Sequence, residues 1–200
     1  MSTQSKSGAS AKPGGRQPSR RALLGLDALN FFLADVRDGL GPYLAIYLIA
    51  VRGPEQGWNE ATVGLVMSIA GIVGLLAQTP AGAFIDRGRH KPAIVIASAT
   101  AVTLSCLALP FIGNFYLVVG TQSVAAIAGA IFPPALAAIT LGLVGPKLFS
   151  KRIGRNEAFN HLGNAASAAI AGATAYFFGP IVVFWLMAVL AVFSVGAMQI

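Results

Sequence analysis

The sequence has few of the residues that build reactive or cross-linked sites. It contains one cysteine, Cys106, and two histidines, His90 and His161, that lie far apart. A disulfide within the chain and a closely spaced zinc-ligand set are therefore excluded. The motifs of a serine nucleophile elbow and of a phosphate-binding loop are also missing. We expect neither an enzyme nor a bound cofactor or metal.

Charged residues are scarce as well. They make up 10% of the 200 residues, whereas hydrophobic residues make up 56%. A soluble domain usually carries about 25% charged residues, and a water-soluble fold cannot bury this much apolar surface. The composition therefore predicts an integral membrane protein. The net charge of +7 does not indicate a nucleic-acid partner, because the basic residues lie between hydrophobic runs.

Apolar stretches occupy most of the chain after residue 20. Each is close to the ~20 residues with which a helix crosses a bilayer. The six stretches are 21–50, 61–85, 92–112, 115–144, 156–178 and 181–200. Short polar or Gly/Pro-rich segments predict turns after the first, third and fifth, and basic connections at 86–91 and 145–155 follow the second and fourth. The sequence thus predicts an all-α membrane protein, with a disordered basic tail at 1–20 and a six-helix transmembrane bundle at 21–200.

The basic residues are distributed unevenly between the two sides of this threading. Arg52 alone lies on one side, and Arg37 falls within the first stretch. The other side carries Lys6, Lys12, Arg16, Arg20 and Arg21 in the tail, Arg87, Arg89 and Lys91 in the second connection, and Lys147, Lys151, Arg152 and Arg155 in the fourth. Because cytoplasmic loops hold the excess of positive charge, both chain ends are expected in the cytoplasm. The expected location is a cell membrane, such as the bacterial inner membrane.

The two ends of the bundle raise separate questions. A cleaved secretory signal is an alternative interpretation of the first stretch, since basic residues precede it. The stretch is too long for a signal, however, and Asp27, Asn30 and Asp35 interrupt its apolar run. At the other end the chain stops at Ile200 inside an apolar stretch. We therefore expect a truncated chain, or one half of a longer polypeptide.

The connection between the second and third stretches carries a recognisable motif. Residues 82–91 read GAFIDRGRHK. They resemble the G-x-x-x-D-R-x-G-R-R/K signature of the major facilitator superfamily, which that family carries in the same loop. Gly82, Asp86 and Arg87 match directly, whereas Arg89 and Lys91 match only loosely. Either one residue is missing after Arg87, or Arg89 stands at the family's second Gly and His90 at its Arg.

In the resembled family this motif latches the two halves of a transporter in one conformation. Gly82 permits close helix approach, and Asp86 can accept hydrogen bonds from the start of a neighbouring helix while Arg87 holds its carboxylate. The alternative is an ordinary charged cytoplasmic turn. We favour the gating role because both the position and the spacing agree.

The first stretch carries charges at a depth where they are costly. Asp35, Arg37 and Asp38 lie about 20 Å above Arg21 at ~1.5 Å per residue, and a charge at mid-bilayer costs at least ~2.5 kcal/mol. The helical period places all three on one arc, so they are expected to face inward together. The resemblance implies a cavity bordered by this stretch, with Asn30 nearby, and a carboxylate that binds the coupling proton. A static Asp–Arg–Asp cluster is the alternative.

The fourth stretch is similar to the family's R-x-x-Q-G pattern in its small residues only. Gln122 stands where the family has its arginine, which weakens proton coupling through that position and leaves Arg37 as the candidate. Gln122 is nevertheless expected in the substrate cavity. Pro133 and Pro134 should kink this helix, and the bend either faces lipid or borders the cavity.

Polar residues at helical spacing begin the fifth stretch. They are Glu157, Asn160, His161 and Asn164. One stripe of this kind suits packing against the other half of a transporter. A proton shuttle between Glu157 and His161 is the alternative, which we consider weaker because one turn separates Glu157 from the cytoplasm.

The resemblance implies two inverted three-helix repeats, which form the amino-terminal bundle of a secondary transporter. Such a bundle needs a carboxy-terminal six-helix half, or a second copy, to enclose a small organic solute. We expect alternating access driven by protons, with the solute, protons and the lipid bilayer as partners. The alternatives are a non-transporting half-transporter remnant, a scaffold or self-pairing six-helix subunit, and a passive facilitator.

Overall fold

The computed structural model describes residues 18–38 and 40–199, and the side chains of Asp38, Gly41 and Pro42 lie outside the description. Most of the expected tail, residues 1–17, also lies outside it. The described chain is helical throughout, which confirms the all-α prediction. Its elements are α1 (Arg20–Asp38), α2 (Gly41–Tyr47), the π-helix η1 (Leu48–Arg52), α3 (Gly53–Gln56), α4 (Glu60–Arg87), α5 (Lys91–Leu107), the 3-10 helix η2 (Leu109–Phe111), α6 (Phe115–Gly129), α7 (Phe132–Phe178) and α8 (Val182–Ala197).

Side-chain caps begin two of the long helices where the sequence predicts turns. The side chain of Asn59 accepts a hydrogen bond from the Thr62 amide, and the Thr62 hydroxyl accepts one from the Asn59 amide, each at 3.0 Å. Asn114 caps α6 in a similar way through its side-chain oxygen. These bonds satisfy amides that have no partner inside the helix, so α4 and α6 begin at defined residues.

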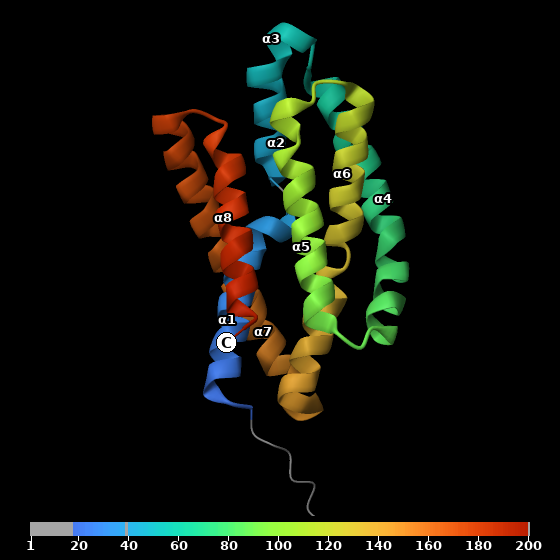
Figure 1. The fold of residues 1–200 in the computed structure, drawn as a ribbon, viewed down its shortest axis with the longest axis vertical. Coiled ribbons are helices and arrows are strands. Elements are labelled where there is room, and N and C mark those ends of the chain that lie inside the picture. The colour runs from blue at the N-terminus through green and yellow to red at the C-terminus, as the bar shows by residue number, and fades with distance from the viewer. Residues whose placement is uncertain (1–17, 39, 200) are drawn as a thin grey trace, which may run out of the picture.

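The prediction that residues 145–155 form a connecting loop is wrong, because residues 146–155 are helical. α7 consists of two helical segments that join at Gly145, where φ is 70° and ψ is 171°. A positive φ suits glycine because it has no Cβ, and Pro146 then restarts the helix at a position where a missing amide hydrogen does no harm. The chain reverses direction at Gly145 (Figure 1). We call the segment before it the inner arm of α7 and the segment after it the outer arm.

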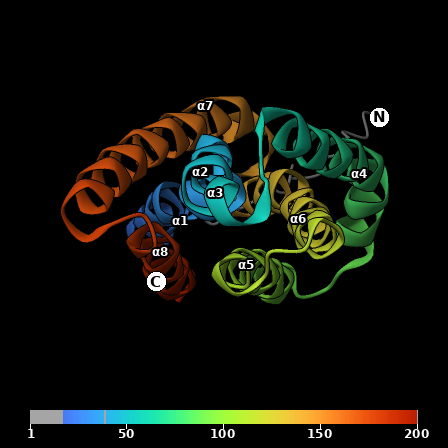
Figure 2. The ribbon, with the colours of Figure 1, turned by 90° about the horizontal axis from the view of Figure 1, so that it is seen from above.

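The helices pack in a regular pattern. α1 packs most extensively against α7 and α8, whereas α6 packs most extensively against α4 and α5. α5 also contacts α7 and α8, which joins the two groups into one bundle. From above, α1, α2 and α6 lie between α4 on one side and the outer arm of α7 on the other (Figure 2).

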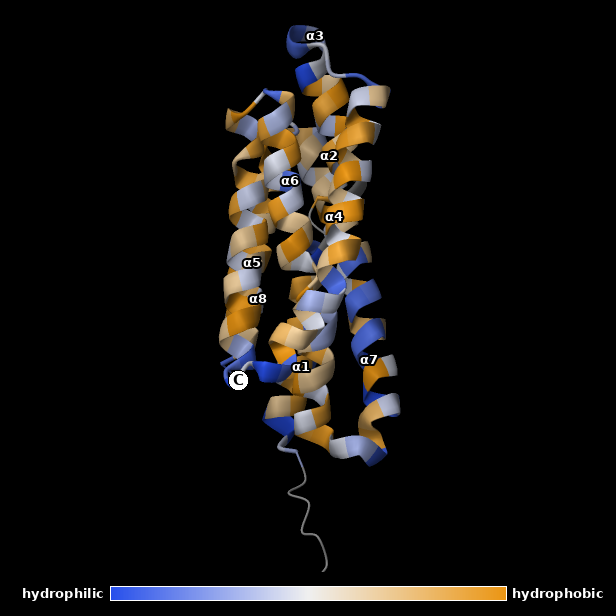
Figure 3. Ribbon diagram, turned by 90° about the vertical axis from the view of Figure 1, so that its right-hand side faces the viewer, coloured by the Kyte–Doolittle hydropathy of each residue, from blue (hydrophilic) through white to orange (hydrophobic). Residues whose placement is uncertain are grey.

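Apolar residues dominate the shafts of the bundle, and polar residues gather at its ends and on part of α7 (Figure 3). Three helical segments of the described chain are long and apolar enough to cross a membrane, namely Glu60–Arg87, Lys91–Phe111 and Phe115–Phe178, and Val182–Ala197 is a shorter apolar helix. The last of the three is 64 residues long, which is about three times the ~20 residues that one crossing requires. The first expected stretch is not among them, since the chain leaves α1 at Asp38 in mid-stretch and α1 carries several charges.

The basic segments lie together at one end of the bundle. α1 begins there, the connection from α4 to α5 turns there, and α7 reverses there (Figure 1). α3 and the connection from α5 to α6 lie at the opposite end (Figure 1). We call these the basic end and the Arg52 end.

α1 and the outer arm of α7 approach each other very closely at Gly163. A Cβ atom added to Gly163 would lie 2.1 Å from the Phe31 carbonyl oxygen and 2.9 Å from the Ala34 Cβ atom. Both contacts are with rigid parts of the neighbouring helix. Small residues allow such close packing in membrane bundles, where burial of apolar surface does not itself drive helices together.

We expect Gly163→Ala to lower the free energy of unfolding by about 1–3 kcal/mol, because the added methyl group must push α1 and α7 apart. Gly172→Ala is the matched control on the same arm, since a Cβ there meets nothing within 4 Å. Alanine favours helix over glycine by up to about 1 kcal/mol, so the control should be neutral or stabilising. Thermal unfolding of both variants in detergent measures the difference, and equal melting temperatures would contradict the close contact.

Candidate functional site

Two interrupted helices meet near the middle of the bundle. α1 ends at Asp38, and the chain passes through Leu40 with a positive φ of 62° before α2 begins at Gly41. α6 ends at Gly129, and α7 begins at Phe132. A Cβ on Gly129 would lie 3.6 Å from the Arg37 carbonyl oxygen. The end of α1 and the end of α6 are therefore in direct contact.

A partly open pocket of about 610 Å³ lies at this meeting point. α1 contributes Arg37 to its wall, α6 contributes Gln122 and Gly129, and the start of α7 contributes Pro133. α4 supplies Gln78 together with several small and apolar residues. The bend near the prolines therefore borders a cavity, which decides between the two alternatives that the sequence leaves open. Gln78 is a polar lining residue that the sequence analysis did not single out.

The amide of Gln122 is held in this pocket without a protein partner. Gln122 is 7% exposed, and its Nε2 atom has no hydrogen-bond partner among the residues that the structure describes. A buried amide left unpaired costs on the order of 1–3 kcal/mol. Polar groups of this kind are uncommon in folded proteins, and a bound molecule or water is a usual reason for them.

One charge at the end of α1, Arg37, reaches across to α7. An Arg37 guanidinium nitrogen lies 3.9 Å from a Glu157 carboxylate oxygen. Asn160 lies beside the pair, with its side-chain nitrogen 3.5 Å from the other Glu157 oxygen. Asp35 is half-buried on the same helix, and the side chain of Asp38 lies outside the described residues. The Arg37–Glu157 pair is partly exposed, so water screens it.

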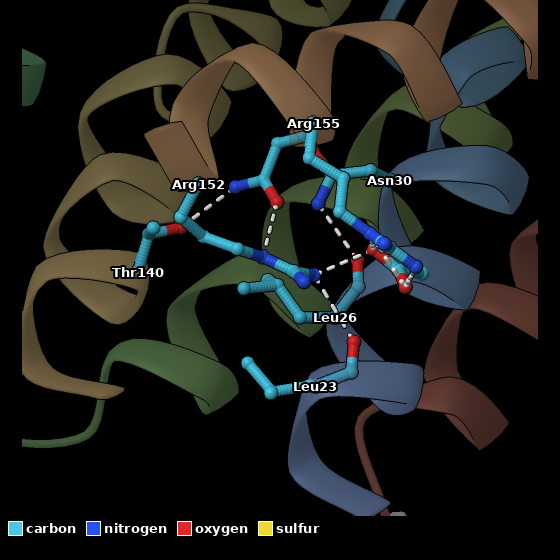
Figure 4. Close-up of polar contacts among 8 residues, drawn as sticks. Leu23, Leu26, Asn30, Thr140, Arg152 and Arg155 are labelled. Atoms are coloured by element: carbon cyan, nitrogen blue, oxygen red, sulfur yellow. Dashed lines mark hydrogen bonds and ion pairs between the residues drawn. The ribbon is translucent and has the colours of Figure 1, made fainter. Parts of the chain in front are cut away.

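A second polar cluster, which the sequence analysis missed, joins α1 to α7 toward the basic end. Asp27 accepts a hydrogen bond of 2.6 Å from Arg152 and one of 2.7 Å from Arg155. Arg152 also donates to the Asn156 side chain at 3.0 Å, and Asn156 donates to Thr140 at 2.8 Å. Figure 4 shows these side chains converging between the two helices. Asp27, Arg152 and Asn156 are buried, which makes this an enclosed, charge-assisted network.

The backbone of α1 takes part in the same cluster. Arg152 donates to the Leu23 carbonyl at 3.0 Å, and the Asn30 side chain donates to the Leu26 carbonyl at 2.7 Å (Figure 4). The Asn30 side chain is thus bonded within α1, and it does not line the 610 Å³ pocket. The expectation of a basic loop at 145–155 hid the cluster, because it placed both arginines outside the bundle. The sequence did contain a signal for this cluster, namely an acid within the first apolar stretch, Asp27, and two arginines three residues apart, Arg152 and Arg155.

The motif at the end of α4 makes few contacts within the described chain. Asp86, Arg87 and Arg89 are exposed, and Asp86 forms no ion pair with Arg87 among the residues described. A Cβ on Gly82 would meet nothing within 4 Å, so no helix of the described chain approaches it closely. Lys91 donates to the carbonyls of residues 85 and 88 at 3.2 and 3.3 Å, which caps the end of α4.

The polar stripe expected on the fifth stretch is divided between two faces of α7. Asn160 is buried, as are Asn156, Gly163 and Ser167 at helical spacing, and this face packs toward α1. Glu157 and His161 are exposed, and Asn164 is intermediate. Only part of the expected stripe is therefore available to a partner outside the bundle.

Comparisons with known proteins agree with the resemblance drawn from the motif. A sequence model described as Major Facilitator Superfamily matches residues 24–198. Two curated relatives, both named as uncharacterised MFS-type transporters and both from strains of Mycobacterium tuberculosis, are each 54% identical over 177 residues. The match covers 88% of this chain and 41% of each relative, so the chain spans about two fifths of their length.

We expect Asp27→Asn to lower the free energy of unfolding by roughly 3–5 kcal/mol, because it leaves Arg152 buried without an opposite charge. Asp86→Asn makes the same chemical change at an exposed site and should stay within about 0.5 kcal/mol. Thermal unfolding in detergent compares the two variants. Adding Arg152→Gln to Asp27→Asn should recover part of the loss, and equal melting temperatures for the two single variants would contradict the pairing.

Proposed function

The chain belongs to the major facilitator superfamily, and from this premise we propose that it forms the amino-terminal six-helix half of a secondary active transporter. The observation that carries the proposal is the unpaired Gln122 amide in a pocket where two interrupted helices meet. In such transporters the solute site lies near mid-membrane, at the interface of repeats and beside discontinuous helices. The pocket has the size of a small-molecule site, which is typically ~300–1,000 Å³.

The packing pattern supports two inverted three-helix repeats. The proposed first repeat comprises the α1–α2 stretch, α4 and α5, and the second comprises α6 with the inner arm of α7, the outer arm, and α8. In this proposal α1 corresponds to α6, α4 to the outer arm of α7, and α5 to α8. The extensive contacts of α1 with α7 and α8 then correspond to the extensive contacts of α6 with α4 and α5. The helix breaks after Asp38 and Gly129 also correspond under this exchange. The inner and outer arms then make separate crossings, which brings the total to six.

The lining of the pocket supports a small organic solute as the cargo. Arg37, Gln78 and Gln122 are its polar lining residues, and the rest of its described wall is apolar or glycine. Such a wall buries hydrocarbon while one cation and two amides orient polar groups. The pocket is partly open, and we propose that a carboxy-terminal six-helix half, or a second copy, closes it.

The charges beside the pocket support proton coupling. Arg37 lies between Asp35 and Asp38 in the sequence and pairs at 3.9 Å with Glu157 of α7. In general, an arginine nearby favours the charged form of a carboxyl group, whereas loss of surrounding water favours its neutral form. Movement of the two halves would therefore change the proton affinity of the acids on α1. Asp35 and Asp38 are the proposed proton carriers.

The exposed residues at the basic end support a gate between halves. Asp86 and Arg87 extend from the end of α4, and the space beside Gly82 is open to a helix from outside this chain. We propose that they contact the second half together with Arg89, while Lys91 holds the end of α4. Glu157 and His161, exposed on α7, are proposed contacts to the same half. The excess of positive charge supports the cytoplasm of a bacterial cell as the proposed location of this end.

We expect Gln122→Leu to impair solute transport while raising thermal stability, because leucine removes an unpaired amide from the pocket wall. Thr103→Val is the matched control, since the Thr103 hydroxyl is also buried without a partner among the described residues but does not line the pocket. The control should raise stability and leave transport unchanged. Flux into proteoliposomes of the complete protein, measured against a panel of drugs, sugars and organic acids, tests both variants. Unchanged flux in Gln122→Leu would remove the solute site from this pocket.

We expect Asp35→Asn and Asp38→Asn, made separately, to abolish uphill transport by the complete protein and to leave its membrane insertion intact. An amide cannot carry the coupling proton, whereas solute exchange at equal pH needs no net proton transfer and should persist. Glu60→Gln removes an exposed carboxylate at the Arg52 end and serves as the control. Flux driven by a pH gradient distinguishes the cases. If both aspartate variants still accumulate solute, the carriers lie elsewhere, and if the native protein ignores the gradient, it is a passive facilitator.

A further inference from the structure

A second, smaller pocket lies at the basic end of the bundle. It encloses about 270 Å³ and is separate from the 610 Å³ pocket, with which it shares no lining residue. Its cationic lining residues are Lys151, Arg152 and Arg155. Its apolar lining residues are Pro18, Leu23, Val144 and Leu148. We refer to it as the Lys151 pocket.

The cations of this pocket exceed the acid that neutralises them. Asp27 is the one carboxylate paired with Arg152 and Arg155 among the described residues, and it does not line the pocket. Lys151 is exposed beside them and forms no ion pair within the described part of the chain. The wall therefore keeps a net positive charge, which favours an anion.

Arg155 is arranged to bind such an anion at low entropic cost. Its side chain is 56% exposed, yet both Nε and Nη2 are held by Asp27, at 3.1–3.2 Å and 2.7 Å. Its guanidinium also lies over the Phe159 ring, 5.3 Å from the centroid. A guanidinium already fixed in one orientation loses little freedom when a further anion binds to it.

The apolar wall distinguishes between kinds of anion. Leu148 is 52% exposed. If a small inorganic ion bound to the cations, Leu148, Leu23 and Val144 would stay exposed to water. An amphiphile would bind the cations with its headgroup and cover these apolar residues with its hydrocarbon. The volume lies just below the ~300–1,000 Å³ of drug-sized sites, which suits a headgroup and the first carbons of its chains. Basic pockets between membrane helices on the cytoplasmic side are suited to anionic lipids.

We propose that the Lys151 pocket binds the phosphate headgroup of an anionic phospholipid. The chain's own tail is a poor occupant, because residues 1–17 carry Lys6, Lys12 and Arg16 and no acidic residue, so like charges oppose its entry. Bound lipid would bridge the start of α1 and the outer arm of α7, the two helices that Asp27 already joins. The inference is independent of any transported solute.

The test compares Lys151→Ala with Lys147→Ala in the protein expressed from its complete reading frame. Both lysines are exposed on the first turns of the outer arm, but only Lys151 lines the pocket. Native mass spectrometry titrates each variant with phosphatidylglycerol, with phosphatidylcholine, and with inorganic phosphate as competitor. We expect the native protein to prefer phosphatidylglycerol, Lys151→Ala to bind it about fivefold more weakly, as one surface cation contributes, and Lys147→Ala to bind it nearly as the native protein does.

Three outcomes would overturn the proposal. Equal weakening by the two lysine substitutions would mean that the charge acts diffusely over the surface. Equal binding of the two phospholipids by the native protein would mean that no anionic headgroup is recognised, as would result if the second half of the protein covered the pocket. Full displacement of phosphatidylglycerol by millimolar inorganic phosphate would assign the pocket to a soluble anion.

Discussion

The structure depends on the contact between α1 and α7, because α1 carries the buried acid Asp27 and the buried amide Asn30 into a core that is mostly apolar. Buried charges are stable only when an opposite charge and hydrogen bonds accompany them. α7 provides these at one level through Arg152 and Asn156, around Asp27. Higher along the helix, Gly163 brings the two backbones into contact. The fit of the two helices is therefore both polar and steric.

The bundle holds two kinds of polar group, which differ in how many hydrogen-bond partners they have. Asp27 accepts hydrogen bonds from both Arg152 and Arg155, which suits it to holding α1 against α7. Gln122 and Arg37, by contrast, border a pocket. The Gln122 side-chain nitrogen has no partner among the described residues, and Arg37 forms a long, partly exposed ion pair with Glu157. The first kind stabilises the scaffold and the second remains available to a solute. The helix breaks at Asp38 and Gly129 lie beside the 610 Å³ pocket, which Asp27 does not line.

Much of the helical layout was predictable from apolar runs and turn residues. The turns at 113–114 and 179–180 appear in the structure as expected, because Asn, Gly and Pro act locally. The segment 52–60 instead contains the short helix α3 (Gly53–Gln56), and only residues 57–59 are non-helical. The prediction of a loop at 145–155 was wrong, since basic residues and a Gly-Pro pair do not reveal whether the chain continues as helix after one residue with positive φ. The polar stripe of α7 was likewise only half located. Helical spacing gives a face, but the neighbour that covers the face is a long-range property.

The sequence by itself determined the class of protein, the approximate helix boundaries, the family motif at Gly82–Arg87 and the uneven distribution of positive charge, because each depends on composition or on residues close in the chain. Only the tertiary structure decided that Asp27 pairs with Arg152 and Arg155 and that Arg37 faces Glu157. It also decided that the Gln122 side-chain nitrogen has no hydrogen-bond partner among the described residues. Those outcomes depend on which helices meet and at what height. Residues more than 100 positions apart then form hydrogen bonds with each other, as Asp27 and Arg152 do with a separation of 125.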